Sequence, residues 1–448
     1  MTQEKLAEFV ARTAEEFGIP GVAVGVLVDG EELTAAHGVT RIGTSSPVDE
    51  QTLFHLASVT KTFTATAVLR LVGQGKVELD APVRRYVPDL TLSDERATEG
   101  ITVLNLLNHT SGLDWNLIDT GTEADSLPGF VARMAELPVI APPGSRASYS
   151  QAGYNLLGRV VENVTGLPFE RAVKELVLDP VGLANTFFDL DDVIVRKFAV
   201  GYNRDEDGTM RAAQPWKAWR AGSRGNNPGG GIVSSVSDAL KWARFHVETD
   251  DELVRGMREQ TVELRASTLG DGFGISWFLR EIDGVRTIGH GGSGNGQFAE
   301  LLIVPERNFA VVSLANAGPD GYVFNQAVVR WALENHLGVV ERDPEPLPYD
   351  EARAREAAGR YEIDAMNVDI ATDGSVLTLV VGIKPEIRAA SEVEMPPDYA
   401  PAAIGFLPDD EYIVVEGGLK GQRGYFSRDT AGSVVGVDLS GRLFTRTS

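Results

Sequence analysis

A serine and a lysine three residues apart, Ser58 and Lys61, are the pair in this sequence best suited to nucleophilic chemistry. They lie in an apolar stretch, Leu53–Leu71, for which the composition predicts a helix. Three residues is nearly one helical turn, so the hydroxyl and the amine share a face and can touch. A lysine kept neutral by burial can take the proton of a serine hydroxyl, which is otherwise a weak nucleophile. The spacing therefore indicates an activated serine, although a helix-capping serine beside a solvated lysine has the same spacing.

A tyrosine and a histidine elsewhere in the chain lie in segments that also fit a reactive site. Tyr149 is part of a Ser-Tyr-Ser-Gln run, and Tyr154 follows it as the better candidate for a packed core aromatic. His290 lies in the glycine-rich segment Gly289–Gly296. The glycines match the letters of a dinucleotide fingerprint, but Phe298–Val304 has the pattern of a strand where that fingerprint requires a helix. They are better explained by a backbone that approaches a substrate closely.

The overall composition is that of a large globular protein with an acidic surface. The chain has 448 residues, 43% of them hydrophobic, which is enough for a sizeable core and two or three domains. Its formal net charge of −23 disfavours nucleic acids and anionic membranes as partners. The sequence contains no cysteine, which excludes disulfides, thiolate metal sites and cysteine nucleophiles. It also has no spacing typical of a metal site, so we expect neither a metal nor another cofactor.

The beginning of the sequence has the pattern of an amphipathic helix, with Leu6, Phe9, Val10, Thr13 and Phe17 at helical spacing. The sequence shows no basic segment followed by an apolar one, as in a secretion signal, and no run of about 18 apolar residues. These features predict a cytoplasmic protein without a membrane partner. They do not indicate an oligomeric state.

Two pairs of apolar segments predict β-hairpins that lie far apart in the chain. Gly21–Val28 and Glu32–His37 flank an Asp-Gly turn, and Phe298–Val304 and Phe309–Ala315 flank a Pro-Glu-Arg-Asn turn. Between them, about residues 80–200 contain helical pieces broken by Pro and Gly. The order predicts an α+β fold, an α/β sandwich with an antiparallel sheet, flanking helices and an inserted helical subdomain.

The last part of the sequence has a different pattern. Residues 339–350 are rich in Pro and charge, which predicts a linker. Residues 351–448 alternate short apolar segments with Gly-containing turns, which predicts a small, antiparallel, barrel-like β domain. Residues 1–338 would then form the catalytic domain.

Together, the motifs resemble the serine β-lactamase and penicillin-binding protein superfamily, most closely its class C β-lactamase, D-alanyl-D-alanine carboxypeptidase and esterase branch. Ser58–Lys61, the segment around Tyr149 and Gly289–Gly296 follow one another in the order and approximate spacing of the three motifs of that family. Asn227–Asp238 is a further matching stretch. The resemblance covers about residues 5–335 and depends on several ordered motifs rather than on one.

The resemblance implies a role for each reactive side chain. Ser58 would be the acylated nucleophile at the start of a buried helix, whose N-terminus favours developing negative charge. Lys61 would act as base or electrostatic partner. Tyr149 would move a proton between the nucleophile and the leaving group. His290 stands where many members have lysine, and the charge of a histidine is adjustable near neutral pH.

The resemblance also implies how the substrate is surrounded. The oxyanion would accept hydrogen bonds from the backbone N–H groups of Ser58 and Ser293, with Gly291 and Gly292 beside the substrate. The second motif departs from the family pattern, because Gln151 stands where asparagine is usual. The additional methylene moves the amide by about 1.5 Å in standard covalent terms, so the substrate preference is expected to differ while the acylation chemistry is kept.

Two tryptophans, Trp216 and Trp219, lie in a predicted loop. They are candidates for the wall of a substrate pocket, although paired tryptophans can equally anchor a loop. An unchanged substrate profile after Trp216→Ala and Trp219→Ala would exclude the pocket interpretation.

The function that these residues indicate is a cofactor-independent serine hydrolase. It would form an acyl-enzyme on Ser58 and cleave a small ester, an amide or a short peptide containing a D-amino acid. Three alternatives remain at this point. They are an acyltransferase that passes the acyl group to an amine or alcohol, a β-lactamase, and a non-catalytic binding protein on the same scaffold.

Overall fold

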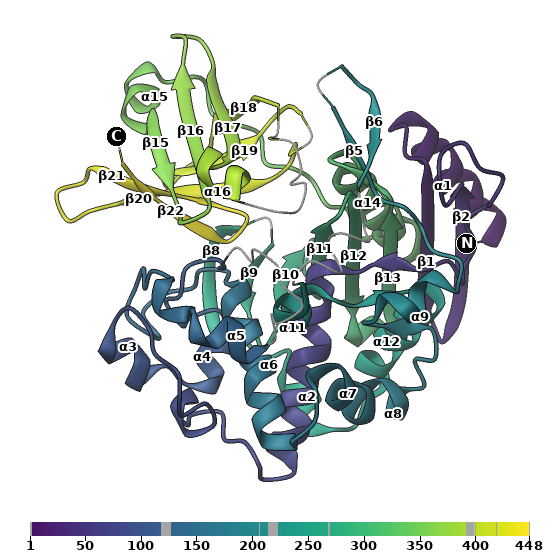
Figure 1. Cartoon of the computed structure of the whole chain (residues 1–448). Helices are drawn as coiled ribbons and strands as arrows, with labels where there is room; N and C mark the ends of the chain where they lie inside the picture. Colours follow the sequence, from purple (N-terminus) through teal and green to yellow (C-terminus); the bar gives the residue numbers. More distant parts are fainter. Residues whose placement is uncertain are drawn as a thin grey trace.

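The computed structural model describes residues 2–117, 127–205, 207–213, 223–267, 269–390, 398, 400–417 and 419–447. Its central element is an eight-stranded antiparallel sheet with the strand order β2-β1-β13-β12-β11-β10-β9-β8 (Figure 1). The strands of this sheet are β1 (Gly21–Val28), β2 (Glu31–Gly38), β8 (Val262–Ser267), β9 (Gly270–Phe273), β10 (Phe278–Ile282), β11 (Val285–Gly294), β12 (Gln297–Val304) and β13 (Phe309–Ala315).

The two hairpins expected from the sequence lie side by side in this sheet, toward the edge formed by β2. β1 pairs with β2 on one side and with β13 on the other, in a register that places Val22 opposite Ala315. β12 pairs with β13 and β11. The expected closure of one sheet by segments from both ends of the catalytic region is therefore confirmed.

Helices cover both faces of the sheet. On one face, α1 (Gln3–Glu16) and α14 (Asp320–Ala332) pack apolar side chains against β1, β12 and β13. On the other face, α12 (Val236–Glu248) packs against β1 and β13 and belongs to the largest hydrophobic cluster. Because both faces are covered, β1 is apolar along nearly its whole length rather than at every second residue.

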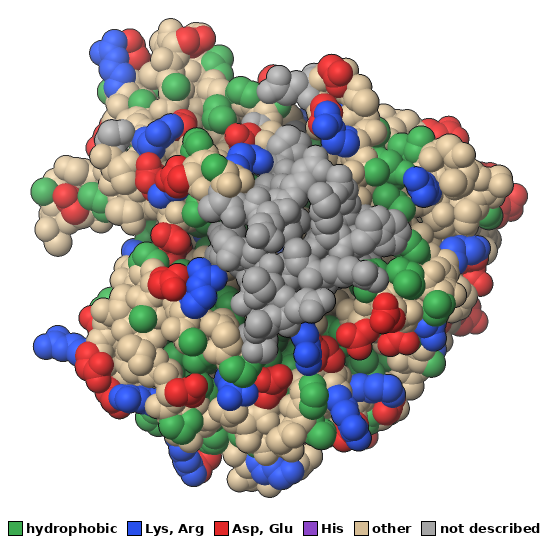
Figure 2. All heavy atoms as spheres, in the orientation of Figure 1, with side chains coloured by type: hydrophobic (Ala, Val, Ile, Leu, Met, Phe, Trp, Pro, Cys, Tyr) green, Lys and Arg blue, Asp and Glu red, His purple; other side chains and the backbone are tan. Residues whose placement is uncertain are grey.

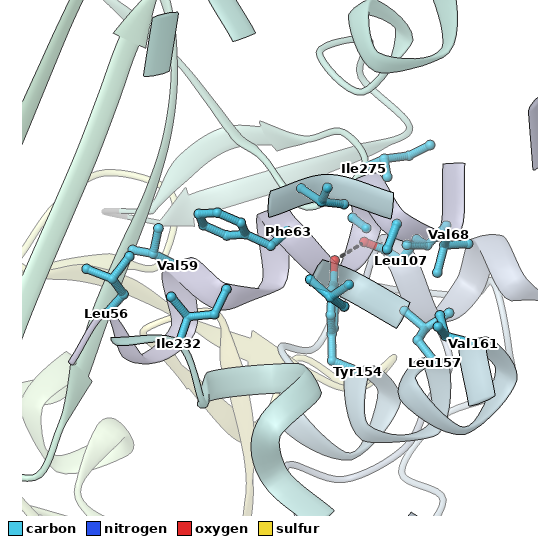
Figure 3. Packing of buried hydrophobic residues seen from close by; sticks show 14 of the residues in the cluster. Leu56, Val59, Phe63, Val68, Leu107, Tyr154, Leu157, Val161, Ile232 and Ile275 are labelled. Atoms are coloured by element: carbon cyan, nitrogen blue, oxygen red, sulfur yellow. Dashed lines mark hydrogen bonds between the residues drawn. The ribbon is translucent and has the colours of Figure 1, made fainter. Parts of the chain in front are cut away.

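The helix that follows the reactive serine is shorter than the sequence indicated. α2 runs from Thr60 to Gly73, and the residues before it form a short strand, β3 (Phe54–His55), and a 3₁₀ turn, Ala57–Val59. α2 is buried on nearly all sides, between the sheet and the inserted helices (Figure 1). Figure 3 shows its neighbours, among them Tyr154, whose hydroxyl donates to the Leu107 carbonyl at 2.8 Å. Its buried threonines donate to backbone carbonyls, as Thr62 does to Val59 and Thr64 to Pro228, so that polar groups are satisfied inside the core.

The region between β2 and β8 contains the inserted helices, one small sheet and two strands of a second small sheet, whose third strand follows β13. Its further helices are α3 (Glu95–Gly100), α4 (Val103–Leu107), α5 (Leu127–Ala132), α6 (Gln151–Thr165), α7 (Phe169–Val173), α8 (Asp179–Val181), α9 (Leu190–Ile194), α11 (Asn227–Gly230) and α13 (Glu252–Gly256). The small sheets are β3-β7-β4, with β4 (Thr186–Phe187) and β7 (Val233–Ser234), and β14-β5-β6, with β5 (Tyr202–Arg204), β6 (Met210–Ala212) and β14 (Ala317–Gly318).

The C-terminal part forms a closed eight-stranded barrel with its own hydrophobic core. It is drawn in light green and yellow in Figure 1. Its elements are α15 (Glu351–Ala357), β15 (Gly359–Glu362), β16 (Met366–Thr372), β17 (Leu377–Ile383), α16 (Pro385–Ala390), β18 (Ala402–Phe406), β19 (Glu411–Val414), β20 (Arg423–Arg428), β21 (Val434–Leu439) and β22 (Arg442–Arg446). The α+β sandwich and the barrel-like domain that the sequence predicted are both confirmed.

The barrel packs against the edge of the large sheet and against the inserted helices. β20 lies beside β8, and Arg265 donates to the Asp409 carbonyl. The Asp364 amide donates to the Asp114 carboxylate at 2.9 Å. Figure 2 shows acidic and basic side chains interspersed over the described part of one face, as in a solvated surface.

Candidate active site

The nucleophile candidate, Ser58, lies where the chain passes from β3 into α2. Ser58 is half-buried, whereas its neighbours Ala57 and Val59 are buried. Ala57 has φ = +45°, a left-handed conformation that costs a non-glycine residue about 1 kcal/mol or more. Strained backbone of this kind concentrates at functional sites, where it fixes the direction of a side chain.

The glycine-rich strand β11 lies directly against this turn. A Cβ atom on Gly292 would collide with the Leu56 carbonyl and would lie 3.1 Å from the Ser58 nitrogen. Only glycine fits at this position, because the two backbones are in contact. The third motif of the sequence is therefore brought next to the first.

Lys61 lies one turn further along and is fully buried. Its Nζ atom is 3.3 Å from Ser58 Oγ, 2.6 Å from Gln151 Oε1 and 2.7 Å from the Gly229 carbonyl oxygen. Burial lowers the pKa of the Lys61 amine well below its usual range, and the nearby positive charge of Arg442 lowers it further. Both causes favour the neutral amine, the form that can accept a proton.

The partners of Lys61 fix the direction of its lone pair. The oxygen atoms of Gln151 and Gly229 can only accept hydrogen bonds, so each takes one N–H of the amine. A neutral amine has two N–H groups, and both are used in this way. The lone pair then points to the third neighbour, Ser58 Oγ, and is in place to take its proton.

Gln151 reaches Lys61 because the facing residue has no side chain. The Gln151 amide lies over Gly229 of α11, where a Cβ atom would collide with the amide nitrogen and carbon. The side-chain amide nitrogen of Gln151 also donates to the backbone carbonyl of Asn226 at 3.3 Å. The methylene that distinguishes glutamine from the usual asparagine is thus accommodated, and the amide oxygen still contacts the lysine.

Tyr149 precedes Ser150, the residue that caps the first turn of α6. Its hydroxyl lies beside the Ser58 side chain, which favours the ionised phenol. Burial raises the pKa of the phenol to about 12, although the contact with Ser58 and the charge of Arg442 oppose this shift. Tyr149 therefore keeps its proton at neutral pH and is a proton donor beside the nucleophile.

His290 faces the same cluster from β11. Its ring centroid is 6.2 Å from that of Tyr149, and its Nδ1 atom donates to the Gly291 carbonyl at 2.7 Å. Burial, helped by the charge of Lys61, lowers the pKa of the imidazole to about 3. The imidazole is thus neutral, with its unprotonated Nε2 buried and without a hydrogen-bond partner among the described residues. The sequence indicated an adjustable charge at this position, and the buried environment removes it.

Two other aromatic side chains support the cluster. His109 stacks on Tyr149 at 4.4 Å and accepts a hydrogen bond from the Ser150 amide at 3.1 Å through Nδ1. Burial lowers the pKa of His109 well below its usual range. Tyr154 is fully buried in the core, as the sequence predicted. His109 thus has a structural position behind Tyr149.

The remaining candidates from the sequence have different positions. Ser293 lies on β11 directly after Gly292, and its side chain is exposed. The Gly291 carbonyl accepts from His290. Trp216 and Trp219 lie outside the described residues, so their assignment to the substrate pocket stays a prediction.

Two residues of the C-terminal barrel also contact the cluster, and the sequence gave no indication of them. The Tyr149 amide donates to the Gly441 carbonyl at 2.8 Å. The guanidinium of Arg442 lies 4.9 Å from the centroid of the Tyr149 ring and 5.6 Å from that of Trp115. The turn between β21 and β22 therefore forms one side of the site.

Two further findings concern metal ions and membranes in the described part of the chain. Among these residues, no group of three or more histidines, aspartates or glutamates is arranged to hold a metal ion. None of the described helices is long and apolar enough to cross a membrane.

Comparisons with known proteins identify the family of this chain. A family model described as β-lactamase matches residues 6–333, well over half of the chain. Penicillin-binding protein 4 from Amycolatopsis lactamdurans is 31% identical over 366 residues, which cover 78% of this chain and 94% of that protein. A β-lactamase from Providencia stuartii is 24% identical over 351 residues, which cover 70% of this chain and 87% of that one.

A solved structure extends the similarity to the barrel. The crystal structure of SurE has a TM-score of 0.76 and 25% sequence identity to this chain, and the match covers 99% of both chains. A second crystal structure, of SurE with D-Leu, has a TM-score of 0.75 at 24% identity. With the three motifs in one cluster and a family model over residues 6–333, the chain belongs to the β-lactamase family, within the superfamily of serine β-lactamases and penicillin-binding proteins.

Proposed function

We propose that this protein is a serine hydrolase that forms an acyl-enzyme on Ser58 and releases the acyl group to water. The observation that carries the proposal is the contact of 3.3 Å between Ser58 Oγ and the Nζ atom of a fully buried lysine, Lys61. Burial lowers the pKa of this lysine and so favours the neutral form that can act as a base, which an exposed lysine does not have. The substrate is a small ester, an amide or a peptide containing a D-amino acid.

In the acylation step, Ser58 Oγ attacks the substrate carbonyl carbon and its proton passes to Lys61 Nζ. The negative charge that develops on the carbonyl oxygen is stabilised by the backbone N–H groups of Ser58 and Ser293. β11 lies against the Ser58 turn, which supports this assignment, because the N–H groups of both backbone segments can then face one substrate carbonyl oxygen.

The leaving group receives its proton from Tyr149. The phenol is protonated at neutral pH, and its hydroxyl contacts Ser58, so it lies next to the bond that breaks. The proton that Lys61 took from Ser58 then passes to the Tyr149 phenolate, which lies beside the lysine, so that both groups regain their initial protonation while Ser58 carries the acyl group. In deacylation the same groups act in reverse, with water as the nucleophile, and Ser58 regains its proton.

His290 contributes polarity without charge. The buried Nε2 atom can accept a hydrogen bond from an N–H or O–H group of the substrate. Because His290 is neutral, it suits an uncharged amide or ester group next to the scissile bond. A substrate carboxylate at this position would require a positively charged partner. SurE, whose fold this chain shares, was crystallised with D-Leu, and D-amino-acid derivatives are therefore the first substrates to test.

The decisive test is detection of the acyl adduct by intact-mass spectrometry. The protein is mixed with matched panels of D-amino-acid and L-amino-acid esters, short D- and L-peptides and a cephalosporin. We expect an adduct whose mass equals the acyl part of at least one ester or peptide, and tryptic mapping to Ser58. Transfer of that acyl group to an added amine in preference to water would instead identify an acyltransferase.

Ser58→Ala is the matched control. It removes only the nucleophilic oxygen, so the adduct should disappear and turnover should fall by several powers of ten. Thermal unfolding at the wild-type temperature shows that the variant is folded. Full activity of folded Ser58→Ala would end the proposal.

A further inference from the structure

The turn between β21 and β22 projects one positively charged side chain, Arg442, into the catalytic cluster. Its guanidinium lies over the rings of both Tyr149 and Trp115. The backbone carbonyl of Trp115 in turn accepts hydrogen bonds from the Gln151 amide at 2.7 Å and the Ala152 amide at 3.0 Å. Arg442 thus contacts Trp115, whose carbonyl binds the first turn of α6, and Tyr149, which precedes that turn.

The turn that carries Arg442 has the geometry of a tight hairpin. Ser440 and Gly441 have φ = +52° and +72°, as in a type I′ hairpin turn, which matches the twist of the flanking strands. Ser440 Oγ donates to the side chain of Gln422 at 2.8 Å. The buried Asp438 carboxyl lies beside Gly441. The turn is therefore shaped by contacts within the barrel itself.

The Gly441 carbonyl completes the connection, because it accepts the hydrogen bond of the Tyr149 amide at 2.8 Å. Tyr149 precedes the cap residue of α6, so this bond aligns the backbone that carries the phenol. Backbone from the barrel and a side chain from the barrel therefore hold the same catalytic tyrosine.

We propose that Arg442 is a positioning residue for acylation: its guanidinium fixes the Tyr149 ring and supplies the positive charge that keeps Lys61 competent as a base. This inference rests on the proposed function. It assigns the barrel a part in the chemistry, in addition to any part in stability.

The charged and titratable groups around Lys61 show why this charge matters. They are Tyr149 and Tyr154 beside α6, His109 behind Tyr149, His290 on β11, and Arg442 with the buried Asp438 on the barrel. Both histidines are neutral, because burial lowers their pKa values. After burial itself, Arg442 is the cause that lowers the pKa of Lys61.

The sign of the expected effect follows from this arrangement. Without the guanidinium, the ammonium form of Lys61 is less disfavoured, so the pKa of the amine rises. A smaller fraction of Lys61 is then neutral at any pH below that value. The acidic limb of the pH profile for acylation must therefore move to higher pH.

The experiment measures the rate of Ser58 acylation by a p-nitrophenyl ester between pH 5 and pH 10, with intact-mass detection of the adduct. Four full-length proteins are compared: wild type, Arg442→Gln, Arg442→Lys and Arg360→Gln. Arg360 lies on β15 of the same barrel in an exposed pair with Asp369, so its loss changes the net charge equally without touching the site.

We expect Arg442→Gln to acylate about tenfold more slowly at pH 7 and to have its acidic limb at higher pH. Arg442→Lys keeps the charge, so its acidic limb should remain at the wild-type pH while its rate falls because the planar stacking is lost. Arg360→Gln should match the wild type in both respects.

Three outcomes overturn the inference or its basis in distinct ways. If wild type forms no adduct with any probe, the proposed function fails. If wild type reacts and Arg442→Gln has an unchanged rate and pH profile, Arg442 has no part in acylation. If Arg442→Gln does not fold, Arg442→Lys decides, because a shifted acidic limb in that charged variant would show that the charge is irrelevant.

Discussion

The large sheet and the barrel both contain eight strands, but they contribute to the site in different ways. The sheet contributes the end of a strand: the last part of β11 lies against the Ser58 turn and contains His290, Gly291, Gly292 and Ser293 in sequence. The barrel offers only one turn, Ser440–Gly441, with the arginine that follows it.

The difference follows from how each sheet is closed. The open sheet is covered by helices on both faces, so one strand can pack against a helix start and share a reactive cluster with it. In a closed barrel, the inward side chains fill the core and the turns project outward. Substitutions on the sheet side should therefore change the rate of the proposed reaction directly. Those on the barrel side should change its pH dependence or the stability of the protein.

The largest effect is expected for Gln151→Glu. A carboxylate 2.6 Å from Lys61 would favour the ammonium form and raise the pKa of the amine, so the base would remain protonated. We expect kcat/KM at pH 7 to fall by about 10²–10⁴-fold, the usual contribution of a general base. The pH profile is the check, since the remaining activity should rise with pH. A wild-type profile would show that Lys61 is not the base.

Gly292→Ala should have the next largest effect. The new methyl group would collide with the Leu56 carbonyl and push β11 away from the Ser58 turn. Separation of the two proposed oxyanion donors should lower kcat by about 10²–10³-fold. Gly294→Ala, two residues further on the same strand, is the control, because its Cβ would have ordinary contacts of 3.6 Å. Equal losses in both variants would contradict the oxyanion assignment.

Gly229→Ala tests the accommodation of Gln151. The added methyl group would displace the glutamine amide from Lys61, with an expected loss of about 100-fold in kcat/KM, as for a displacement of about 1 Å. The neighbouring Gly230→Ala should be nearly neutral, because its Cβ would meet other atoms only at 3.8 Å or more. A steady-state assay of both proteins is sufficient, and an active Gly229→Ala would mean that Gln151 is dispensable.

The smallest effect is expected on the barrel side, for Asp438→Asn. Burial raises the pKa of the Asp438 carboxyl to about 7, above its value of 3.8 in the unfolded chain. Between these values the folded state holds the proton that the unfolded state has lost, so this group lowers stability as pH rises from about 4 to 7.

Asparagine keeps an acceptor for Gly441 but cannot ionise. The variant should therefore be more stable than wild type at pH 8, by on the order of 1 kcal/mol, and close to wild type at pH 5. Thermal unfolding at the two pH values measures the difference. If Asp438→Asn loses as much stability as wild type between pH 5 and pH 8, the loss is caused by other groups.

Much of this arrangement could be predicted from the sequence because its signals are local. The spacing of Ser58 and Lys61, the two hairpins and the glycines of Gly289–Gly296 each depend on residues that are neighbours in the chain. The α+β architecture and the barrel followed from the same short-range patterns.

Other features depend on contacts that no local pattern encodes. The start of α2 was placed too early, because Phe54–His55 is held as a strand by pairing with the distant β7. The neutral state of His290 results from burial, and the approach of Gly441 and Arg442 to Tyr149 results from docking of the barrel. The run of glycines at 229–231 was a signal that could have indicated close packing around Gln151.

The pairing of β1 with β13 has a consequence for how the protein acquires activity. Val22 and Ala315 must meet across nearly the whole catalytic region, whereas seven of the eight barrel pairings join strands that follow one another in the sequence. The eighth pairing, of β15 with β22, closes the barrel. Closing a long loop costs entropy before the contacts that it allows can form, so the barrel should fold quickly and the large sheet slowly. After dilution from denaturant, helical and barrel signals should return first. Competence for the proposed acylation should return with the last long-range step.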